Sequence, residues 1–222
     1  PLFRVTVLFH ENKGKTTMEF TMAFSSEQAA KETAKFIKQA GGNGTWDRLA
    51  EYLEEQKSGK AVFVVNRSFA CDVDTMYRLW TEPEHFSKWL APTGMTMKFI
   101  RAEIKPGGRS FYSMEGNNIK MYGKVEYLNF DPPHGLVYVQ QFADENENPS
   151  RHPMAPNFPQ TMKTTVQFAA EDTGTTRVTV TWEPYGQVSA AELETFLQMR
   201  AGMTQGWTGS FDKLEIYMDQ KN

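Results

Sequence analysis

The stretch of this chain with the clearest potential for acid–base chemistry is TEPEHFSKW, at residues 81–89. It places Glu82 and Glu84 beside His85, and a carboxylate next to an imidazole can transfer protons in a reaction. A structural explanation accounts for the same residues, because Thr81 and Glu84 have the spacing of a capped helix start. We expect Glu84 to cap that helix and His85 to face solvent. We therefore assign no catalytic residue to this segment.

Residue types that bind metals or act as nucleophiles are dispersed along the rest of the chain. Metal sites need several ligands at close spacing, and the single cysteine, Cys71, has no partner of that kind. The segment GGNGT at residues 41–45 lacks the lysine and the spacing of a phosphate-binding loop, so we expect no metal and no cofactor. Arg109 and Glu103 could form a polar pair, although ordinary surface charge explains them as well. The histidines, none of them paired at metal-ligand spacing, are His10, His85, His134 and His152.

Composition limits the classes of partner that this chain can have. The formal net charge of −3 over 222 residues gives no electrostatic footprint for nucleic acid. No apolar run approaches the roughly 18 residues that cross a membrane, and the start of the sequence does not resemble a signal peptide. One cysteine suits a reducing compartment. We therefore expect a cytoplasmic protein, in which the glycosylation sequons at Asn43 and Asn66 occur by chance.

The sequence contains an internal repeat, and the repeated elements form part of the framework that would position any site. Residues 44–56 (GTWDRLAEYLEEQ) align with residues 209–221 (GSFDKLEIYMDQK), and most of the aligned pairs are identical or conservative. Upstream of them, residues 5–24 resemble residues 164–184. Each of these segments has two runs of alternating apolar and polar residues around a glycine-containing turn. Alternation of period two predicts a half-buried antiparallel hairpin in both copies.

The repeat also predicts where the domains divide. We expect residues 1–57 to be the C-terminal part of one domain, residues 58–60 a linker, and residues 61–222 a complete second domain. Trp46 and Phe211 should then lie at equivalent places on their helices. A hairpin and a helix alone leave a large apolar face exposed. Three explanations are open: the upstream part of the first domain is missing, residues 1–57 pack on the second domain or on another chain, including a second copy, or the half-domain is a natural remnant.

The second domain has the element order of an α+β protein. We predict one strand, two short helices, six strands and a long helix, which gives an antiparallel sheet curled against that helix. The two short helices are expected at residues 73–80 and 83–90, with Trp80 and Trp89 anchoring them in the sheet.

The long C-terminal helix has a recognisable start and several interruptions. Ser189 and Glu192 have the spacing of a capping box, and apolar residues then recur every three or four positions. Gly202, Gly206 and Gly209 interrupt this stripe. We expect them to kink the helix or to let it lie close against the sheet.

Several motifs of the second domain occur in one order: LWTEPEHFSKWLAP at 79–92, IKPGG at 104–108, DPPHGLVY at 131–138 and GMTQGWTGSFDKLEIYM at 202–218. In this combination residues 61–222 resemble the Bet v 1-like (START-related, SRPBCC) superfamily. The most similar branch is the one named for the C-terminal domain of the heat shock protein 90 ATPase activator. The resemblance implies a helix-grip fold, in which a curved antiparallel β-sheet wraps around a long C-terminal α-helix and two short helices follow the first strand. An apolar cavity often lies between sheet and helix in this superfamily.

Residues on the inward face of the predicted sheet and on the apolar stripe of the helix are candidates to line such a cavity. Each of them individually could equally fill a packed core. As a group, and with the family resemblance, they favour a cavity for an apolar or amphipathic small molecule. The candidates are Phe111, Met121, Tyr138, Met162, Val166, Val180, Trp182, Met203, Trp207 and Phe211.

We therefore expect a binding protein more than an enzyme. An enzyme of the cyclase or hydrolase type, known elsewhere in the superfamily, would need a polar group inside the cavity. The sequence offers only Tyr112, Tyr122, Tyr138 and Gln140 for that purpose. A chaperone-interacting protein is a third hypothesis that rests on the name of the branch. The sequence identifies neither the ligand nor the oligomeric state.

Overall fold

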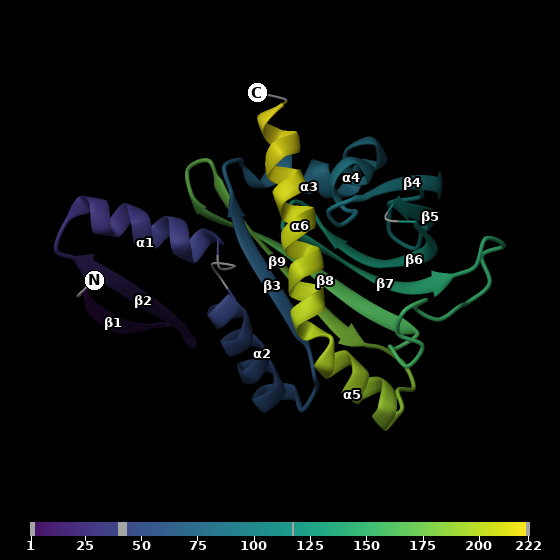
Figure 1. Ribbon diagram of the computed structural model, residues 1–222, viewed down its shortest axis with the longest axis horizontal. Coiled ribbons are helices and arrows are strands. Elements are labelled where there is room, and N and C mark those ends of the chain that lie inside the picture. The colour runs from purple at the N-terminus through teal and green to yellow at the C-terminus, as the bar shows by residue number, and fades with distance from the viewer. Residues whose placement is uncertain (1–2, 40–43, 117, 221–222) are drawn as a thin grey trace. The chain divides into compact units, whose positions relative to one another are not determined.

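The computed structural model describes residues 3–39, 44–116 and 118–220 of the chain. Contacts divide the chain into two compact units, Pro1–Gly42 and Asn43–Asn222. The second unit contains a seven-stranded sheet, and the first contains a two-stranded sheet and a helix (Figure 1). No helix among the described residues is long and apolar enough to cross a membrane.

One curved antiparallel sheet organises the second unit, with its strands in the order β3-β9-β8-β7-β6-β5-β4 (Figure 1). Strands β4 to β9 follow one another as neighbours, and β3 pairs with β9, so the first strand lies beside the last. The strands are β3 (Phe63–Phe69), β4 (Met95–Arg101), β5 (Arg109–Gly116), β6 (Ile119–Asp131), β7 (Gly135–Ala143), β8 (Thr161–Asp172) and β9 (Thr175–Pro184).

Helices accompany this sheet, and the longest of them lies across it (Figure 1). The described helices of the second unit are α2 (Gly44–Ser58), α3 (Val73–Thr81), α4 (Pro83–Trp89), α5 (Ala190–Gln198) and α6 (Arg200–Asp219). The two short helices follow the first strand of the sheet, and the long helix ends the chain. The predicted α+β helix-grip fold is confirmed.

The core of the second unit lies between the sheet and helices α3, α4 and α6. Val166 of β8 and Val180 of β9 are directly paired and point into it, with 1% and 0% of their surface exposed. Trp80 and Trp89 are fully buried, as the sequence predicts, and the Trp80 ring stacks on Trp207 of α6 with centroids 6.0 Å apart. Burying such a side chain contributes about 1.5–3 kcal/mol. This aromatic cluster therefore fixes the short helices to α6.

The C-terminal helix is divided at Met199, before it reaches its glycines. The predicted capping box of Ser189 and Glu192 starts α5, and Met199 both ends α5 and precedes α6. Helix α6 then continues through all three glycines. A Cβ atom on Gly209 would lie 3.0 Å from the backbone nitrogen of Thr93. This glycine therefore allows close packing and does not kink the helix.

The start of α4 differs from the sequence prediction. Glu82 is the N-cap residue and makes no side-chain cap bond, and Pro83 occupies the first turn, where its missing N–H is tolerated. Thr81 does not cap α4, because its hydroxyl donates to the carbonyl of Tyr77 at 2.8 Å in the preceding helix. Glu84 is exposed in the first turn and caps nothing.

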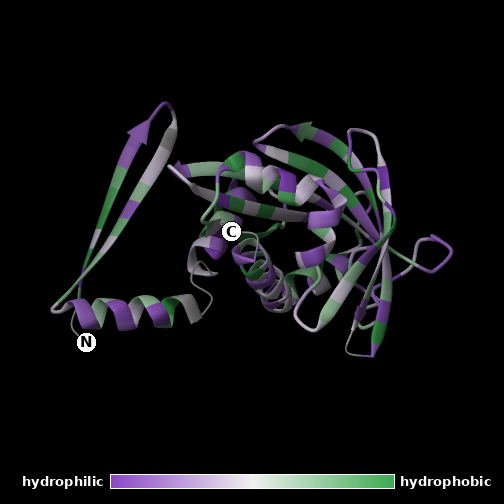
Figure 2. Cartoon of the chain, turned by 90° about the horizontal axis from the view of Figure 1, so that it is seen from above, coloured by the Kyte–Doolittle hydropathy of each residue, from purple (hydrophilic) through white to green (hydrophobic). Residues whose placement is uncertain are grey.

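The first unit is an amphipathic hairpin followed by one helix. Figure 2 shows hydrophobic and hydrophilic residues alternating along the two strands. The register pairs Val5 with Met22 and Val7 with Phe20, so the apolar residues share one face. That face is poorly covered, and Phe9 on it is 68% exposed. The elements are β1 (Phe3–Asn12), β2 (Lys15–Phe24) and α1 (Glu27–Gln39).

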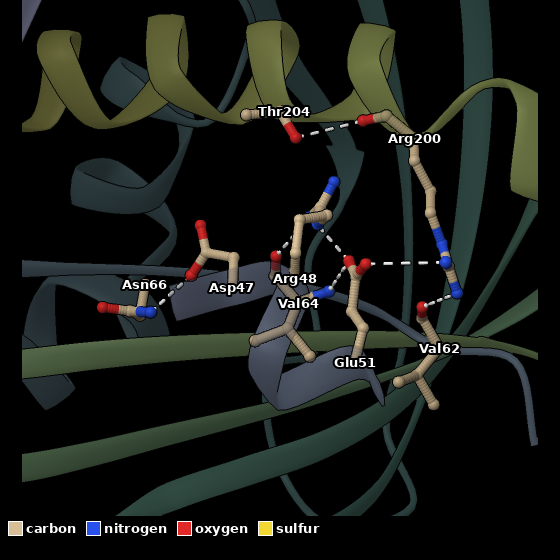
Figure 3. A network of polar contacts seen from close by, with 8 residues as sticks. All are labelled: Asp47, Arg48, Glu51, Val62, Val64, Asn66, Arg200 and Thr204. Carbon is tan, nitrogen blue, oxygen red and sulfur yellow. Dashed lines mark hydrogen bonds and ion pairs between the residues drawn. The ribbon is translucent and has the colours of Figure 1, made fainter. Parts of the chain in front are cut away.

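Within the second unit, helix α2 packs against β3, at the edge of the sheet (Figure 3). The Glu51 carboxylate accepts the backbone N–H of Val64 at 2.8 Å, and Arg48 donates to the Val64 carbonyl at 3.2 Å. Arg200 of α6 donates to the carbonyl of Val62 at 2.5 Å. These side chains bond edge groups that another strand could otherwise pair with.

The compact units thus divide at Gly42, whereas the sequence repeat places the domain boundary at residues 58–60. The difference arises because α2 attaches through polar side chains, including Asp47, which accepts a hydrogen bond from the Asn66 amide. The description of residues 1–57 as part of a repeated domain stays a prediction. Of the two sequons, Asn66 is half-buried in this contact, and Asn43 lies outside the described residues.

Candidate functional site

A cavity of about 260 Å³ lies between the sheet and the C-terminal helices. Strands β5, β6, β7 and β9 form one wall, and the α5–α6 junction with the first half of α6 forms the other. The segment after α4 and the loop between β7 and β8 complete the lining. Most of the lining side chains are aromatic or aliphatic, which is typical of small-molecule sites.

Half of the predicted site residues line this cavity. They come from three strands and from the long helix, and the fold brings them together around one space. Trp182 and Trp207 are in direct edge-to-face contact in this lining, with ring centroids 5.6 Å apart. The predicted residues in the lining are Met121, Tyr138, Trp182, Met203 and Trp207.

Four other predicted residues lie on the inward side but do not line the cavity. Phe211 packs edge-on against Phe69 of β3, with centroids 5.4 Å apart, and is 1% exposed. Helix α3 contacts both β8 and β9, and α6 contacts β3, so this part of the inward side belongs to the packed core. The residues of this group, all in the hydrophobic core, are Met162, Val166, Val180 and Phe211.

Phe111 is the one predicted site residue that the structure places on the wrong side of its strand. Successive side chains of a strand point to opposite faces, and in β5 it is the neighbouring Tyr112 that lines the cavity. The Tyr112 ring lies over Gly123 of β6, the residue with which it pairs. Phe111 stacks instead on Tyr122, with centroids 5.7 Å apart.

Sequence reasoning missed several lining residues. Loop residues give no periodic signal, so His152 and Phe158 could not be assigned to a wall in advance. Gly202 and Gly206 were noticeable in the sequence, because they interrupt the apolar stripe of the helix. They do not kink the helix, however. A Cβ atom added to either would meet no heavy atom within 4 Å. These glycines leave open space on the helix face that lines the cavity.

Burial shifts the pKa of three titratable groups in the lining in the direction that favours their uncharged forms. Burial raises the pKa of Tyr112 to about 12, and it raises the pKa of Tyr138 strongly. Burial lowers the pKa of His152. The Nδ1 atom of His152 accepts the backbone N–H of Met154 at 3.1 Å, which places the proton of the neutral ring on Nε2.

Two indole donors at the cavity wall have no acceptor. The Nε1 atoms of Trp182 and Trp207 are buried, and neither has a hydrogen-bond partner among the described residues. The buried hydroxyl of Ser210, also in the lining, is already committed, since it donates to the carbonyl of Leu90 at 2.6 Å. Buried donors are nearly always paired in folded proteins, so these two nitrogens are exceptions, and their lack of accessible surface means that they do not face the open space of the cavity.

The acid–base segment at 81–89 has a structural arrangement outside the cavity lining. His85 is half-buried, which corrects the prediction that it faces solvent. Its Nε2 lies 3.1 Å from the Glu82 carboxylate, and its Nδ1 lies 2.8 Å from the Tyr217 hydroxyl of α6. These contacts tie the start of α4 to the C-terminal helix.

The remaining candidate polar groups do not form a reactive centre within the described part of the chain. Arg109 pairs with Glu126 at 3.3 Å on the surface, which agrees with the interpretation of Arg109 as ordinary surface charge. No group of three or more His, Cys, Asp and Glu side chains in the described ranges could hold a metal ion.

A curved antiparallel sheet that grips a long C-terminal helix around an apolar cavity defines the helix-grip class of proteins. Within this class, the chain belongs to the family described as "Activator of Hsp90 ATPase homolog 1-like protein", which matches residues 70–219. The family membership predicted from the motifs is confirmed. No curated protein matches the chain.

Solved structures with the same fold come from several bacteria. Protein Ms6760 from Mycobacterium smegmatis is 24% identical with a TM-score of 0.60, over 71% of this chain and 90% of that one. A protein from Arthrobacter aurescens is 21% identical with a TM-score of 0.61, over 72% and 86%. One from Staphylococcus epidermidis is 24% identical with a TM-score of 0.56, over 73% and 92%. At these identities the similarity shows the fold alone.

Proposed function

We propose that this protein binds a small, largely apolar molecule in the cavity between the sheet and α6. The observation that carries the proposal is the open space in front of Gly202 and Gly206, opposite a wall of aromatic and methionine side chains. A well-packed core leaves few voids larger than a water molecule. A space of about 260 Å³ is slightly below the usual range of ligand pockets, roughly 300–1,000 Å³. It suits a compact ligand.

Mass spectrometry of gently purified protein tests this proposal directly. Under native conditions we expect a mass above that of the chain, and under denaturing conditions we expect the chain alone with a released small molecule. The neutral fluorophore 6-propionyl-2-(dimethylamino)naphthalene supplies a second measurement. It should bind with a blue-shifted emission, because its surroundings in the cavity are apolar.

A cavity-blocking variant makes the test specific. In Gly206→Phe the new side chain has open space in front of its Cβ atom, so it can enter the cavity without moving the backbone. We expect the affinity for the fluorophore to fall at least about tenfold, which is about 1.4 kcal/mol. The matched control is Ala201→Phe, at an exposed position of the same helix. Equal binding by both variants, together with no retained mass, would overturn the proposal.

A further inference from the structure

One polar side chain interrupts the apolar wall of the cavity and indicates the chemistry of the ligand. We infer that the side-chain amide of Gln140 is the recognition group of this site. The ligand is then a compact, uncharged molecule that carries a group able both to donate and to accept a hydrogen bond, such as a carboxamide or a hydroxyl. The inference rests on the proposed binding function and specifies what the same cavity selects.

Gln140 lies on the inward face of β7. Successive side chains of a strand point to opposite faces, and Leu136 and Tyr138, which precede Gln140 by four and two positions, are both buried in the core. Phe142, two positions after Gln140, lines the cavity as Gln140 itself does. The Gln140 side chain therefore points into the space between the sheet and the helices.

The neighbours of Gln140 in the sheet offer its amide no hydrogen bond. Its direct cross-strand partners are Val125 of β6 and Met162 of β8, which are apolar and only 8% and 2% exposed. No group in the described part of the chain forms a hydrogen bond with the Gln140 side chain. The adjacent Gln141, on the outer face, differs in this respect, because its amide donates to the Thr161 hydroxyl at 2.6 Å. The Gln140 amide is thus an uncommitted polar group among apolar neighbours.

The Gln140 amide is also accessible from the cavity. The described side-chain atoms that lack both a partner and accessible surface include the indole nitrogens of Trp182 and Trp207, but neither amide atom of Gln140. Gln140 is half-buried, and the surface that it leaves open on the inward face lines the cavity. A glutamine amide supplies both N–H donors and a carbonyl acceptor. A molecule in the cavity can therefore bond both ends of this amide.

The Tyr112 hydroxyl adds a second neutral polar group to the same wall. The Tyr112 ring lies over Gly123 of β6, and Gly123 pairs with Phe142, two residues from Gln140 on β7. Tyr112 and Gln140 also line together a second, much smaller space beside Phe86. Burial raises the pKa of Tyr112 to about 12, so its hydroxyl keeps its proton at neutral pH. This wall therefore matches a polar group without charge.

The lining carries no charge that could pair with an ionised ligand. No Asp, Glu, Lys or Arg side chain is in the lining formed by the described residues. The ammonium group of Lys213 on α6 is committed elsewhere, because it donates to the carbonyls of Ala91 and Met95 at 2.7 and 2.9 Å. A carboxylate or ammonium group on the ligand would enter the cavity without a counter-ion, which is strongly unfavourable. A pure hydrocarbon would leave the Gln140 amide unpaired, which is also unfavourable.

Three compounds with one skeleton test the ligand chemistry: 3-phenylpropanamide, 2-methyl-4-phenylbut-1-ene and 3-phenylpropanoate. They differ only at the end of the chain, which is a carboxamide, a hydrocarbon group of the same shape or a carboxylate. Binding is measured at pH 7.5 by isothermal titration calorimetry or ligand-observed NMR. We expect the carboxylate to bind at least about 100-fold more weakly than the carboxamide. The carboxamide and the hydrocarbon differ in hydration, so their affinity ratio is compared between protein variants, where that difference cancels.

Two variants of adjacent glutamines then test the recognition group. Gln140→Leu removes the amide and keeps a side chain of similar size, so the ratio of carboxamide to hydrocarbon affinity should fall about tenfold, the effect of one or two neutral hydrogen bonds. Gln141→Leu, on the outer face of the same strand, should leave the ratio unchanged. Circular dichroism and thermal melting show whether each variant is folded. In the unmodified protein, a nuclear Overhauser effect between the Gln140 amide protons and bound 3-phenylpropanamide gives a measurement that does not depend on the variants.

Different failures have different meanings. If the carboxylate binds as tightly as the carboxamide, the inferred absence of charge on the ligand is wrong while the binding function stands. If Gln140→Leu leaves the affinity ratio unchanged, or the nuclear Overhauser effect is absent, Gln140 is not the recognition group. If none of the three compounds binds but the fluorophore does, the inferred ligand class is wrong. If the fluorophore does not bind either, and no small molecule is retained on purification, the proposed function itself fails.

Discussion

The hairpins β1–β2 and β8–β9 have nearly the same local structure and very different surroundings. Both turn through two residues with a positive-φ glycine, Gly14 at 73° and Gly174 at 89°. Both place apolar residues on one face. At corresponding positions of the repeat, however, Phe9 is 68% exposed and Phe168 is 3% exposed. Amphipathic alternation therefore determines the hairpin, while neighbouring strands and a covering helix determine whether its apolar face is buried.

The helices that follow the hairpins differ in the same way. Phe211 on α6 is 1% exposed in the core, whereas Trp46, the aligned residue on α2, is half-buried. The aligned aspartates both reach β3, but Asp47 is buried against Asn66 and Asp212 forms an exposed ion pair with Arg67 at 2.6 Å. Two similar helix sequences thus have different roles, a core helix in α6 and an edge cover in α2.

The largest expected difference between the copies comes from truncating the paired phenylalanines. Phe168→Ala should lower the free energy of unfolding by about 3–5 kcal/mol, because it leaves a cavity beside Trp80 and Tyr77. Phe9→Ala should change it by no more than about 0.5 kcal/mol. Urea denaturation followed by circular dichroism measures both. A cost above about 1.5 kcal/mol for Phe9→Ala would show that the hairpin face is covered in solution, as predicted for residues 1–57 packed against a partner.

A pH-dependent difference is expected between the aligned aspartates. Burial raises the pKa of Asp47 to about 7 from an ordinary 3.8, although the Arg48 charge and the Asn66 hydrogen bond oppose the rise. Burial raises the pKa of the adjacent Glu51 as well. For Asp47, the folded-state pKa lies above the unfolded one. Its stabilising contribution is therefore full below pH 3.8 and is lost as the pH rises through about 7.

Replacing the buried carboxyl by an amide should remove this loss. We expect Asp47→Asn to be about 2–3 kcal/mol more stable than the unmodified protein at pH 8 and nearly equal to it near pH 4. Asp212→Asn is the control and should cost no more than about 1 kcal/mol, because it removes a surface ion pair. Urea denaturation at pH 4, 6 and 8 provides the measurement. A stability difference for Asp47→Asn that is the same at every pH would contradict the assignment.

The smallest expected difference concerns the aligned glycines Gly44 and Gly209. Gly209→Ala should destabilise the protein by about 1–3 kcal/mol, because its methyl group would contact the backbone of Thr93 at 3.0 Å. A Cβ atom on Gly44 meets nothing within 4 Å, so Gly44→Ala should stay within about 0.5 kcal/mol. Thermal unfolding of both variants tests the pair. Equal melting temperatures would mean that α6 does not need its close approach to the loop after α4.

Local signals in the sequence predicted most of the fold correctly. Period-two alternation located the strands of both hairpins, and the spacing of Ser189 and Glu192 located the start of α5, because both signals depend only on nearby residues. The order of elements and the family motifs then determined the helix-grip architecture. The break at Met199 was not predictable in this way, since no glycine or proline marks it.

The sequence predicted the candidate site only in part. It indicates which face of a strand a residue is on, but not whether the space in front of that residue is filled or open. Alternation tells which residues of β8 face inward, but Val166 faces a filled region and Tyr138 on the next strand faces an open one. That distinction depends on which side chains of other elements pack in front of each strand. The prediction named both Phe111, as a wall residue, and Tyr112, as a polar group inside the cavity, although neighbouring residues of a strand point to opposite faces. Of these two, only Tyr112 is in the lining.

The cover that α2 places on β3 also has a consequence for self-association. A sheet edge with free N–H and C=O groups is a template on which an identical chain can add a strand. Here Arg48, Glu51 and Arg200 already bond the edge groups of Val62 and Val64. A foreign strand would have to displace three charged side chains and leave the 2% exposed Glu51 without its partners. Helix α2, together with Arg200 of α6, therefore protects this edge of the sheet against aggregation.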